Sequence, residues 1–198
     1  DHLLFTGATS IGKHVMRAAS ENLVPVTLEL GGKSPVIISD TSNVEQSSKR
    51  IIAGKTMNAG QICLAPDYVL LPENKLNKFI AHAEETVSSM FPSIKNNDDY
   101  TSVINERHYS RLKSYIDEAK DNGCEVIEIN PAEEDFEQQE HYKIPPTLLI
   151  NPDDNLKVMQ EEIFGPILPI KTYKEFGEAI DYINKKDRPL GLYYFGNN

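Results

Sequence analysis

Cys63 stands in the sequence context best suited to nucleophilic chemistry. It follows residues 58–62, with the sequence NAGQI, where glycine and small side chains leave a backbone N–H exposed beside the thiol. A thiolate nucleophile that uses its own N–H as an oxyanion donor needs such a loop. A free cysteine is more commonly a small buried hydrophobe, and Cys124, which opens a predicted strand after Gly123, fits that alternative well.

Glu29 is a candidate general base. It is flanked by Leu28 and Leu30 in an otherwise apolar segment, where strand alternation points its side chain opposite to theirs. A carboxylate beside apolar walls has a pKa raised towards neutrality, as a general base needs at physiological pH. The alternative is a solvent-facing residue on a half-buried strand, and the residues alone leave both open.

Gly7, Ala8 and Gly12 belong to a predicted turn between a short apolar strand and a helix. Such a turn can present backbone N–H groups at a helix N-terminus to a phosphate. Its glycine spacing matches neither the Gly-x-Gly-x-x-Gly nor the Walker pattern, so an ordinary strand-to-helix turn is the stronger alternative.

Glu162 and Phe164 lie in the run QEEIFGP at positions 160–166. The carboxylate can accept hydrogen bonds from both hydroxyls of a ribose, and the aromatic ring can pack against a nicotinamide. The alternative is a helix end followed by a turn, which the residues alone favour.

Composition and charge exclude several classes of function. Lys and Arg number 20 against 30 Asp and Glu, which gives a net charge of −10 and argues against nucleic acid as a partner. No apolar run approaches the roughly 20 residues that span a bilayer, so no membrane span is predicted. Two cysteines make no disulfide framework and no zinc spacing, and no histidine has a partner at metal or triad spacing. We therefore predict no metal site and a cytoplasmic location.

Strands alternate with helices along almost the whole chain, which predicts an α/β fold with an open, mainly parallel, twisted sheet flanked by helices. In such sheets the ligand site lies at the carboxyl ends of the strands. An acidic stretch at 132–140 is predicted to be a solvated loop. Strands are predicted at 3–5, 24–30, 36–39, 68–71, 124–129, 147–150, 167–173 and 190–195, and helices after Gly12 and at 43–57, 76–90, 109–119 and 176–183.

Three segments together resemble the motifs of one family, the aldehyde dehydrogenase superfamily, in the same order. Residues 26–35 (VTLELGGKSP) resemble its glutamate signature, residues 58–63 (NAGQIC) its cysteine signature, and residues 161–166 (EEIFGP) its cofactor-ribose motif. Residues 63–69 (CLAPDYV) look most like the class 3 and coniferyl-aldehyde branch. The resemblance covers nearly the whole chain and implies the Rossmann-like fold of the family's catalytic domain.

The resemblance also implies roles for the residues. Cys63 would attack an aldehyde and form a thiohemiacetal, hydride would pass to the nicotinamide of NAD or of NADP, and Glu29 would activate water to hydrolyse the thioester. The Leu30 carbonyl would face the nicotinamide amide, and Glu162 and Phe164 would hold the ribose and the ring.

The same resemblance implies that residues 1–26 are the last βα unit of an NAD-binding domain and that residues 27–198 are a catalytic domain truncated at both ends. It places most cofactor contacts outside the chain, so we expect the fragment itself to be inactive. It also implies that the full-length parent is a homo-oligomer. The family commonly has a hydroxyl residue where this chain has Ala8.

Two other functions remain open. A CoA-acylating relative would pass the acyl group to a thiol and would not need Glu29, whose presence argues against it. A non-catalytic interaction domain is the second alternative.

Overall fold

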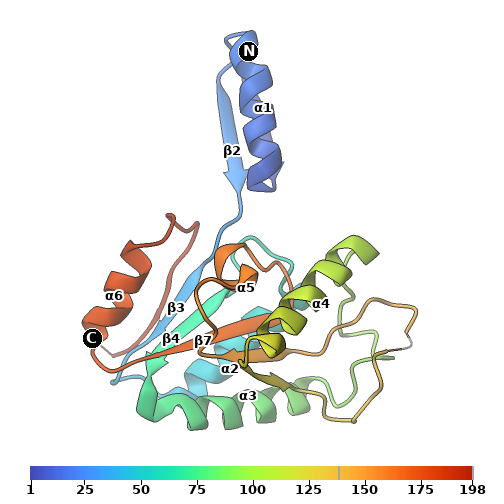
Figure 1. Ribbon diagram of the computed structural model, residues 1–198, viewed down its shortest axis with the longest axis vertical. Helices are drawn as coiled ribbons and strands as arrows, with labels where there is room; N and C mark the ends of the chain where they lie inside the picture. The colour runs from blue at the N-terminus through green and yellow to red at the C-terminus, as the bar shows by residue number, and fades with distance from the viewer. Residues whose placement is uncertain (138, 198) are drawn as a thin grey trace.

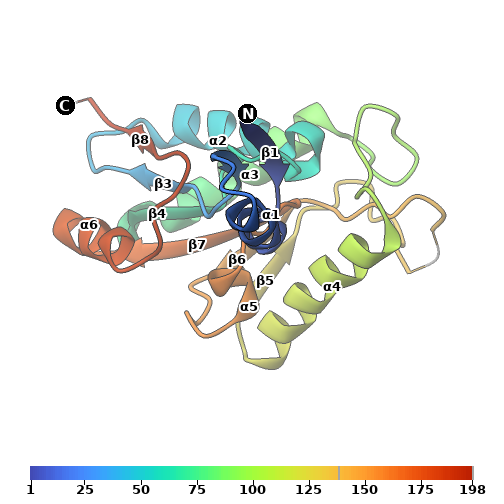
Figure 2. The same ribbon diagram turned by 90° about the horizontal axis from the view of Figure 1, so that it is seen from above.

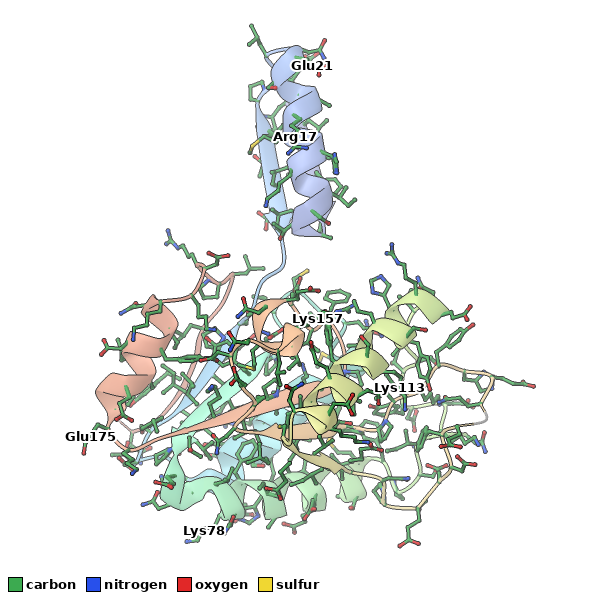
Figure 3. All side chains as sticks on the ribbon, viewed as in Figure 1. Arg17, Glu21, Lys78, Lys113, Lys157 and Glu175 are labelled. Carbon is green, nitrogen blue, oxygen red and sulfur yellow. The ribbon has the colours of Figure 1, made fainter. Side chains whose placement is uncertain are left out.

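The computed structural model describes residues 1–137 and 139–197, which form a small projecting unit and a larger body. In the projecting unit, β1 (Leu3–Gly7) runs parallel to β2 (Val26–Leu30), and α1 (Thr9–Glu21) connects them. Figure 1 shows this unit, in blue, standing away from the body, and Figure 3 shows the α1 side chains, among them Arg17 and Glu21, clear of it. Residues 31–34 join the two parts.

The body is built on a six-stranded sheet with the order β5-β6-β7-β4-β3-β8. All neighbouring strands are parallel except β5 and β6, which are antiparallel. The prediction of an open, mainly parallel α/β sheet is therefore confirmed. The strands are β3 (Pro35–Ile38), β4 (Tyr68–Pro72), β5 (Glu125–Glu128), β6 (Thr147–Ile150), β7 (Ile167–Tyr173) and β8 (Tyr193–Phe195).

Helices cover both faces of this sheet, as Figure 2 shows from above. On one face α2 and α3 pack against Val36, Ile38, Val69 and Leu71, and on the other α6 packs near Ile37 and Leu70. Successive strand residues thus face opposite layers, as the period of two in a strand requires. The helices are α2 (Val44–Thr56), α3 (Leu76–Met90), α4 (Glu106–Asp121), α5 (Lys157–Gln160) and α6 (Phe176–Asn184), with short 3₁₀ turns η1 (Met57–Gly60) and η2 (Glu73–Lys75).

The predicted bounds of the last strand are wrong in part. The last strand begins at Tyr193 rather than at 190, because residue 191 lies against Leu64 instead of pairing with β3. The acidic stretch 132–140, of which residue 138 lies outside the described residues, is an exposed or half-exposed loop as predicted, and it is anchored to the body. Its Glu134 carboxylate accepts hydrogen bonds from the backbone N–H groups of Ile94 (2.6 Å) and Lys95 (3.0 Å).

Within the two described ranges, no helix combines the length and the apolar composition needed to cross a membrane.

Candidate active site

The loop that carries Cys63 begins with a sharp reversal after α2. Asn58, Ala59 and Gly60 have φ angles of 50°, 51° and 73°, three consecutive left-handed residues of which two are not glycine. Left-handed conformations cost of order 1–3 kcal/mol in side-chain-bearing residues and persist only where the surroundings impose them. Gly60 itself must be glycine, because a Cβ there would collide with the carbonyl of Gly165. The cysteine loop therefore lies in contact with the 161–166 segment.

Cys63 is half-buried on a tight turn that its neighbours hold at several points. The Ala65 N–H donates to the Ile62 carbonyl at 2.9 Å and closes the turn around the cysteine. The Tyr193 hydroxyl donates to the Leu64 carbonyl at 2.5 Å. Among the hydrogen bonds of the described residues, none uses the Cys63 N–H as donor. The thiol and its N–H thus stand together on a fixed loop, as an oxyanion donor beside a nucleophile requires.

Lys55 supports the same loop from inside the protein. It is 2% exposed, and its ammonium donates to the Pro66 carbonyl at 2.8 Å. Burial, with a smaller contribution from the Lys33 charge, lowers the pKa of Lys55 to about 8, against the opposing effects of the Asp67 and Glu162 carboxylates. A lysine that is neutralised this easily is sensitive to any change in its surroundings.

Cys124 has a different environment. It immediately precedes β5, with its Sγ 3.4 Å from the carbonyl oxygen of Ile150. Burial raises the pKa of the Cys124 thiol, so less of it is thiolate at neutral pH. This agrees with the interpretation of Cys124 as a structural cysteine.

Glu162 sits where three segments of the chain converge. Its carboxylate lies against the Gly31–Gly32 turn, close to the Gly32 N–H. Burial raises the pKa of Glu162, and the Asp67 charge acts in the same direction, against the effects of Lys33 and the Gly32 N–H. The carboxylate is thus partly removed from water, and its oxygens can accept hydrogen bonds from the hydroxyl groups of a ligand.

The backbone around Glu162 is fixed by charged side chains. Arg111 of α4 donates to the carbonyls of Glu162 (3.3 Å) and Ile163 (2.7 Å). Lys33 donates to the Glu161 carbonyl at 2.9 Å, and Asp67 accepts the Ile163 N–H at 3.0 Å.

Phe164 is a further left-handed residue, with φ of 48°, and it is half-buried. The residue after it packs against Leu112, which leaves no room for a Cβ at position 165. A bulky residue in this conformation is strained, and strain of this kind is typical of functional sites.

Glu29 lies on the exposed side of β2, with Leu28 and Leu30 on the opposite, half-buried side. The side chains alternate along β2 as the sequence predicts. Because of this alternation, the apolar side chains of Leu28 and Leu30 point away from the Glu29 carboxylate and do not surround it. No hydrogen bond joins Glu29 to Cys63 in the part of the chain that the structure describes. Of the predicted pair, the structure positions the nucleophile firmly and leaves the carboxylate facing solvent.

The turn after β1 lies beside Leu30, because Gly7 pairs with Leu30 in the two-stranded sheet. Ala8 is the N-cap of α1 and makes no side-chain capping bond, so no side chain competes for the first N–H groups of the helix. Gly12 is inside α1 rather than in the turn. It packs against the Leu30 side chain, which a Cβ would meet at 2.9 Å.

These residues suit a dinucleotide better than a metal. A half-buried carboxylate can hold ribose hydroxyls, and the N-terminus of α1 can face a phosphate. Over residues 1–137 and 139–197, no group of three or more His, Cys, Asp or Glu side chains could hold a metal ion.

An apolar groove of about 370 Å³ lies beside the cysteine loop, lined by residues of α2, β3, β8 and the loop, including Ile62 and Leu64. Cys63 is not among its lining residues. The groove therefore does not by itself define where a substrate meets the thiol.

The predictions from sequence did not include the residues that connect these segments, namely Lys33, Asp67, Lys55 and Arg111. Lys33 and Asp67 stand inside the segments that resemble family motifs, which is the signal that could have drawn attention to them. Their pairing across 34 positions is visible only in the fold.

Comparison with known proteins matches residues 1–198 to the family model described as "Aldehyde dehydrogenase family". The chain is 62% identical over 198 residues to a "Probable coniferyl aldehyde dehydrogenase" of Caulobacter vibrioides, and 56% identical to the "Coniferyl aldehyde dehydrogenase" of a Pseudomonas species. Each match covers 100% of this chain and 41% of the relative, so the chain spans about two fifths of the length of these curated relatives.

Among solved structures, the chain is similar to the substrate-bound state of Staphylococcus aureus AldH. The TM-score is 0.90 and the identity 41%, and the match covers 100% of this chain and 42% of that one.

Proposed function

The chain belongs to the aldehyde dehydrogenase family, and we propose that it is the catalytic part of an enzyme that oxidises an aldehyde to a carboxylic acid with NAD or NADP. The observation that carries this proposal is the joining of the Cys63 loop and the Glu162 segment at one place, through the contact between Gly60 and Gly165. The proposed nucleophile and the proposed cofactor-binding carboxylate thus belong to segments that pack against each other.

In the proposed reaction, the Cys63 sulfur attacks the carbonyl carbon and the carbonyl oxygen becomes an oxyanion. The Cys63 N–H donates a hydrogen bond to that oxyanion, since no acceptor within the described residues uses it. After loss of hydride the acyl group remains on sulfur as a thioester. Glu29 takes a proton from the water that hydrolyses this thioester, which releases the acid and restores the thiol.

For the cofactor, we propose that Glu162 binds the ribose next to the nicotinamide, that Phe164 packs on the ring, and that the Leu30 carbonyl accepts from the amide. Gly7, Ala8 and Gly12 place the start of α1, whose N–H groups face the pyrophosphate. When bound, the nicotinamide supplies the hydride acceptor. The proposal covers both NAD and NADP as the cofactor.

We further propose an aromatic aldehyde of the coniferyl type as substrate, on the 62% and 56% identity to proteins of that name. The division into residues 1–26 and 27–198 stays a prediction; strand β2, which continues to Leu30, pairs with β1 rather than with the six-stranded sheet. A homo-oligomeric parent protein and a cytoplasmic location also stay predictions.

The test uses the full-length protein that contains this sequence. Coniferaldehyde and an aliphatic aldehyde are each supplied with NAD and with NADP, and reduced cofactor is followed by absorbance. Cys63→Ser should abolish turnover and Cys124→Ser, the matched control, should not. Absence of oxidation by the wild-type protein would refute the function. Acyl-CoA formation that depends on added CoA would favour the CoA-acylating alternative.

A further inference from the structure

We propose that Gly31 and the Lys33–Asp67 ion pair position the Glu162 carboxylate, so that these three residues control cofactor binding through Glu162 without touching the reacting atoms. This inference rests on the proposed function, in which Glu162 binds the cofactor ribose.

The ion pair holds the backbone on both sides of Glu162. The Lys33 ammonium contacts one oxygen of Asp67 and also donates to the carbonyls of Val158 (2.7 Å) and Glu161 (2.9 Å). The other Asp67 oxygen accepts the Ile163 N–H at 3.0 Å. One member of the pair therefore binds the residue before Glu162, and the other binds the residue after it.

The position of the pair links this clamp to the cysteine loop. Asp67 is four residues beyond Cys63, and its own N–H donates to the Ser34 carbonyl at 2.9 Å. Its side chain is only 4% exposed and that of Lys33 only 15%. Buried ion pairs add little net stability compared with apolar packing, so a pair with this many directed hydrogen bonds is better explained by the geometry that it imposes.

Gly31 provides the place for the carboxylate itself. An added Cβ at Gly31 would overlap both carboxylate oxygens of Glu162, whereas an added Cβ at Gly177 in α6 would meet no atom of the described residues within 4 Å. Neither glycine has a positive φ, so alanine is compatible with the backbone at both positions. A methyl group at Gly31 therefore moves the end of a flexible side chain rather than the fold.

The experiment is a double-mutant cycle in the full-length protein. Gly31→Ala, Glu162→Ala and the double variant are compared with Gly177→Ala, a matched control in α6 outside the proposed binding site. The measurements are the dissociation constant of the reduced cofactor, from its fluorescence, and kcat and KM for the oxidised cofactor. Asp67→Asn, alone and combined with Glu162→Ala, tests the ion pair with a side chain of the same shape.

Gly31→Ala should weaken cofactor binding about tenfold to a hundredfold, the usual worth of hydrogen bonds to a charged acceptor. Gly177→Ala should bind the cofactor as the wild type does. In the Glu162→Ala background Gly31→Ala should have no further effect, because the carboxylate it displaces is gone. Asp67→Asn should follow the same pattern.

An equal loss from Gly31→Ala in both backgrounds would overturn the proposal, since it would show that Gly31 acts independently of Glu162. A crystal structure of the Gly31→Ala variant provides a readout that does not need activity. A Glu162 carboxylate that keeps its place there would also overturn the positioning role. If the wild-type protein oxidises no aldehyde, the proposed function fails. The crystal structure of the Gly31→Ala variant would still show whether Gly31 positions the Glu162 carboxylate.

Discussion

Replacing Lys55 by methionine should remove a pH dependence from the stability of the chain. The side chain is buried, and the pKa of its ammonium falls from the ordinary 10.5 to about 8 on folding. Below pH 8 the lysine is charged in both folded and unfolded chains, and the folded state bears the full cost of burying the charge. Between pH 8 and 10.5 the folded chain has released the proton while the unfolded chain still holds it. The unfolded state therefore binds more protons, and stability rises with pH.

The shift sets the size of the effect. The fall from 10.5 to about 8 corresponds to about 3 kcal/mol over the whole titration, since one pKa unit is worth about 1.4 kcal/mol. About 2 kcal/mol of this falls between about pH 7.5 and 9.5. Burial also raises the pKa of the Cys124 thiol and lowers the pKa of Lys75, so these groups contribute to the pH dependence in the same window. The effect of Lys55 is therefore the difference between the wild type and Lys55→Met, in which the other contributions cancel.

The assay is equilibrium urea unfolding at several pH values across this window. The wild-type free energy of unfolding should rise by about 2 kcal/mol more than that of Lys55→Met. Lys49→Met is the matched control on the same helix, because Lys49 is exposed and pairs with Glu45 at 2.7 Å, which raises its pKa. That control should keep the wild-type pH dependence. Parallel curves for the wild type and Lys55→Met would refute the reasoning.

Three further outcomes are expected. Brief, substoichiometric iodoacetamide treatment followed by mass spectrometry should label Cys63 ahead of Cys124, whose thiol pKa is raised by burial, and predominant labelling at Cys124 would contradict this. In the full-length protein, Glu29→Gln should keep a burst of reduced cofactor while steady turnover falls by roughly two to four orders of magnitude; unchanged turnover would exclude the role. The chain alone, which spans 41% of its relatives, should show neither micromolar NAD binding by titration calorimetry nor steady aldehyde oxidation, and either result would reverse that expectation.

Helices and buried strands were predictable wherever the burial pattern is local. The α3 bounds match the predicted range because Phe79, Ala83 and Val87 recur on one face and all three are fully buried. Asn43 caps α2 as expected, with its side chain accepting the Gln46 N–H at 2.9 Å.

The shape of the site was less predictable, because it depends on contacts between distant segments. Nothing near Ala59 in the sequence signals a left-handed residue, and its conformation accompanies the approach of Gly165, more than a hundred positions away. The exposure of Glu29 was equally hidden, since alternation alone does not say which side of β2 is covered. Lys33 was visible as a motif residue but its three acceptors were not.

Two glycines from different motifs meet the same short segment of chain. Gly60 lies against the carbonyl of Gly165, and Gly31 lies against the carboxylate of Glu162. A side chain at Gly60 would push against the backbone of the segment that carries Phe164, whereas a methyl group at Gly31 would displace only the Glu162 carboxylate of that segment. Phe164 itself is held in a left-handed conformation. Such a conformation persists only where its neighbours allow no other, and the directed bonds of Arg111 and Asp67 supply that restraint. The segments around Gly31, Cys63 and Glu162 therefore pack against one another. A substitution that moves the backbone of one segment should change the geometry of the other two.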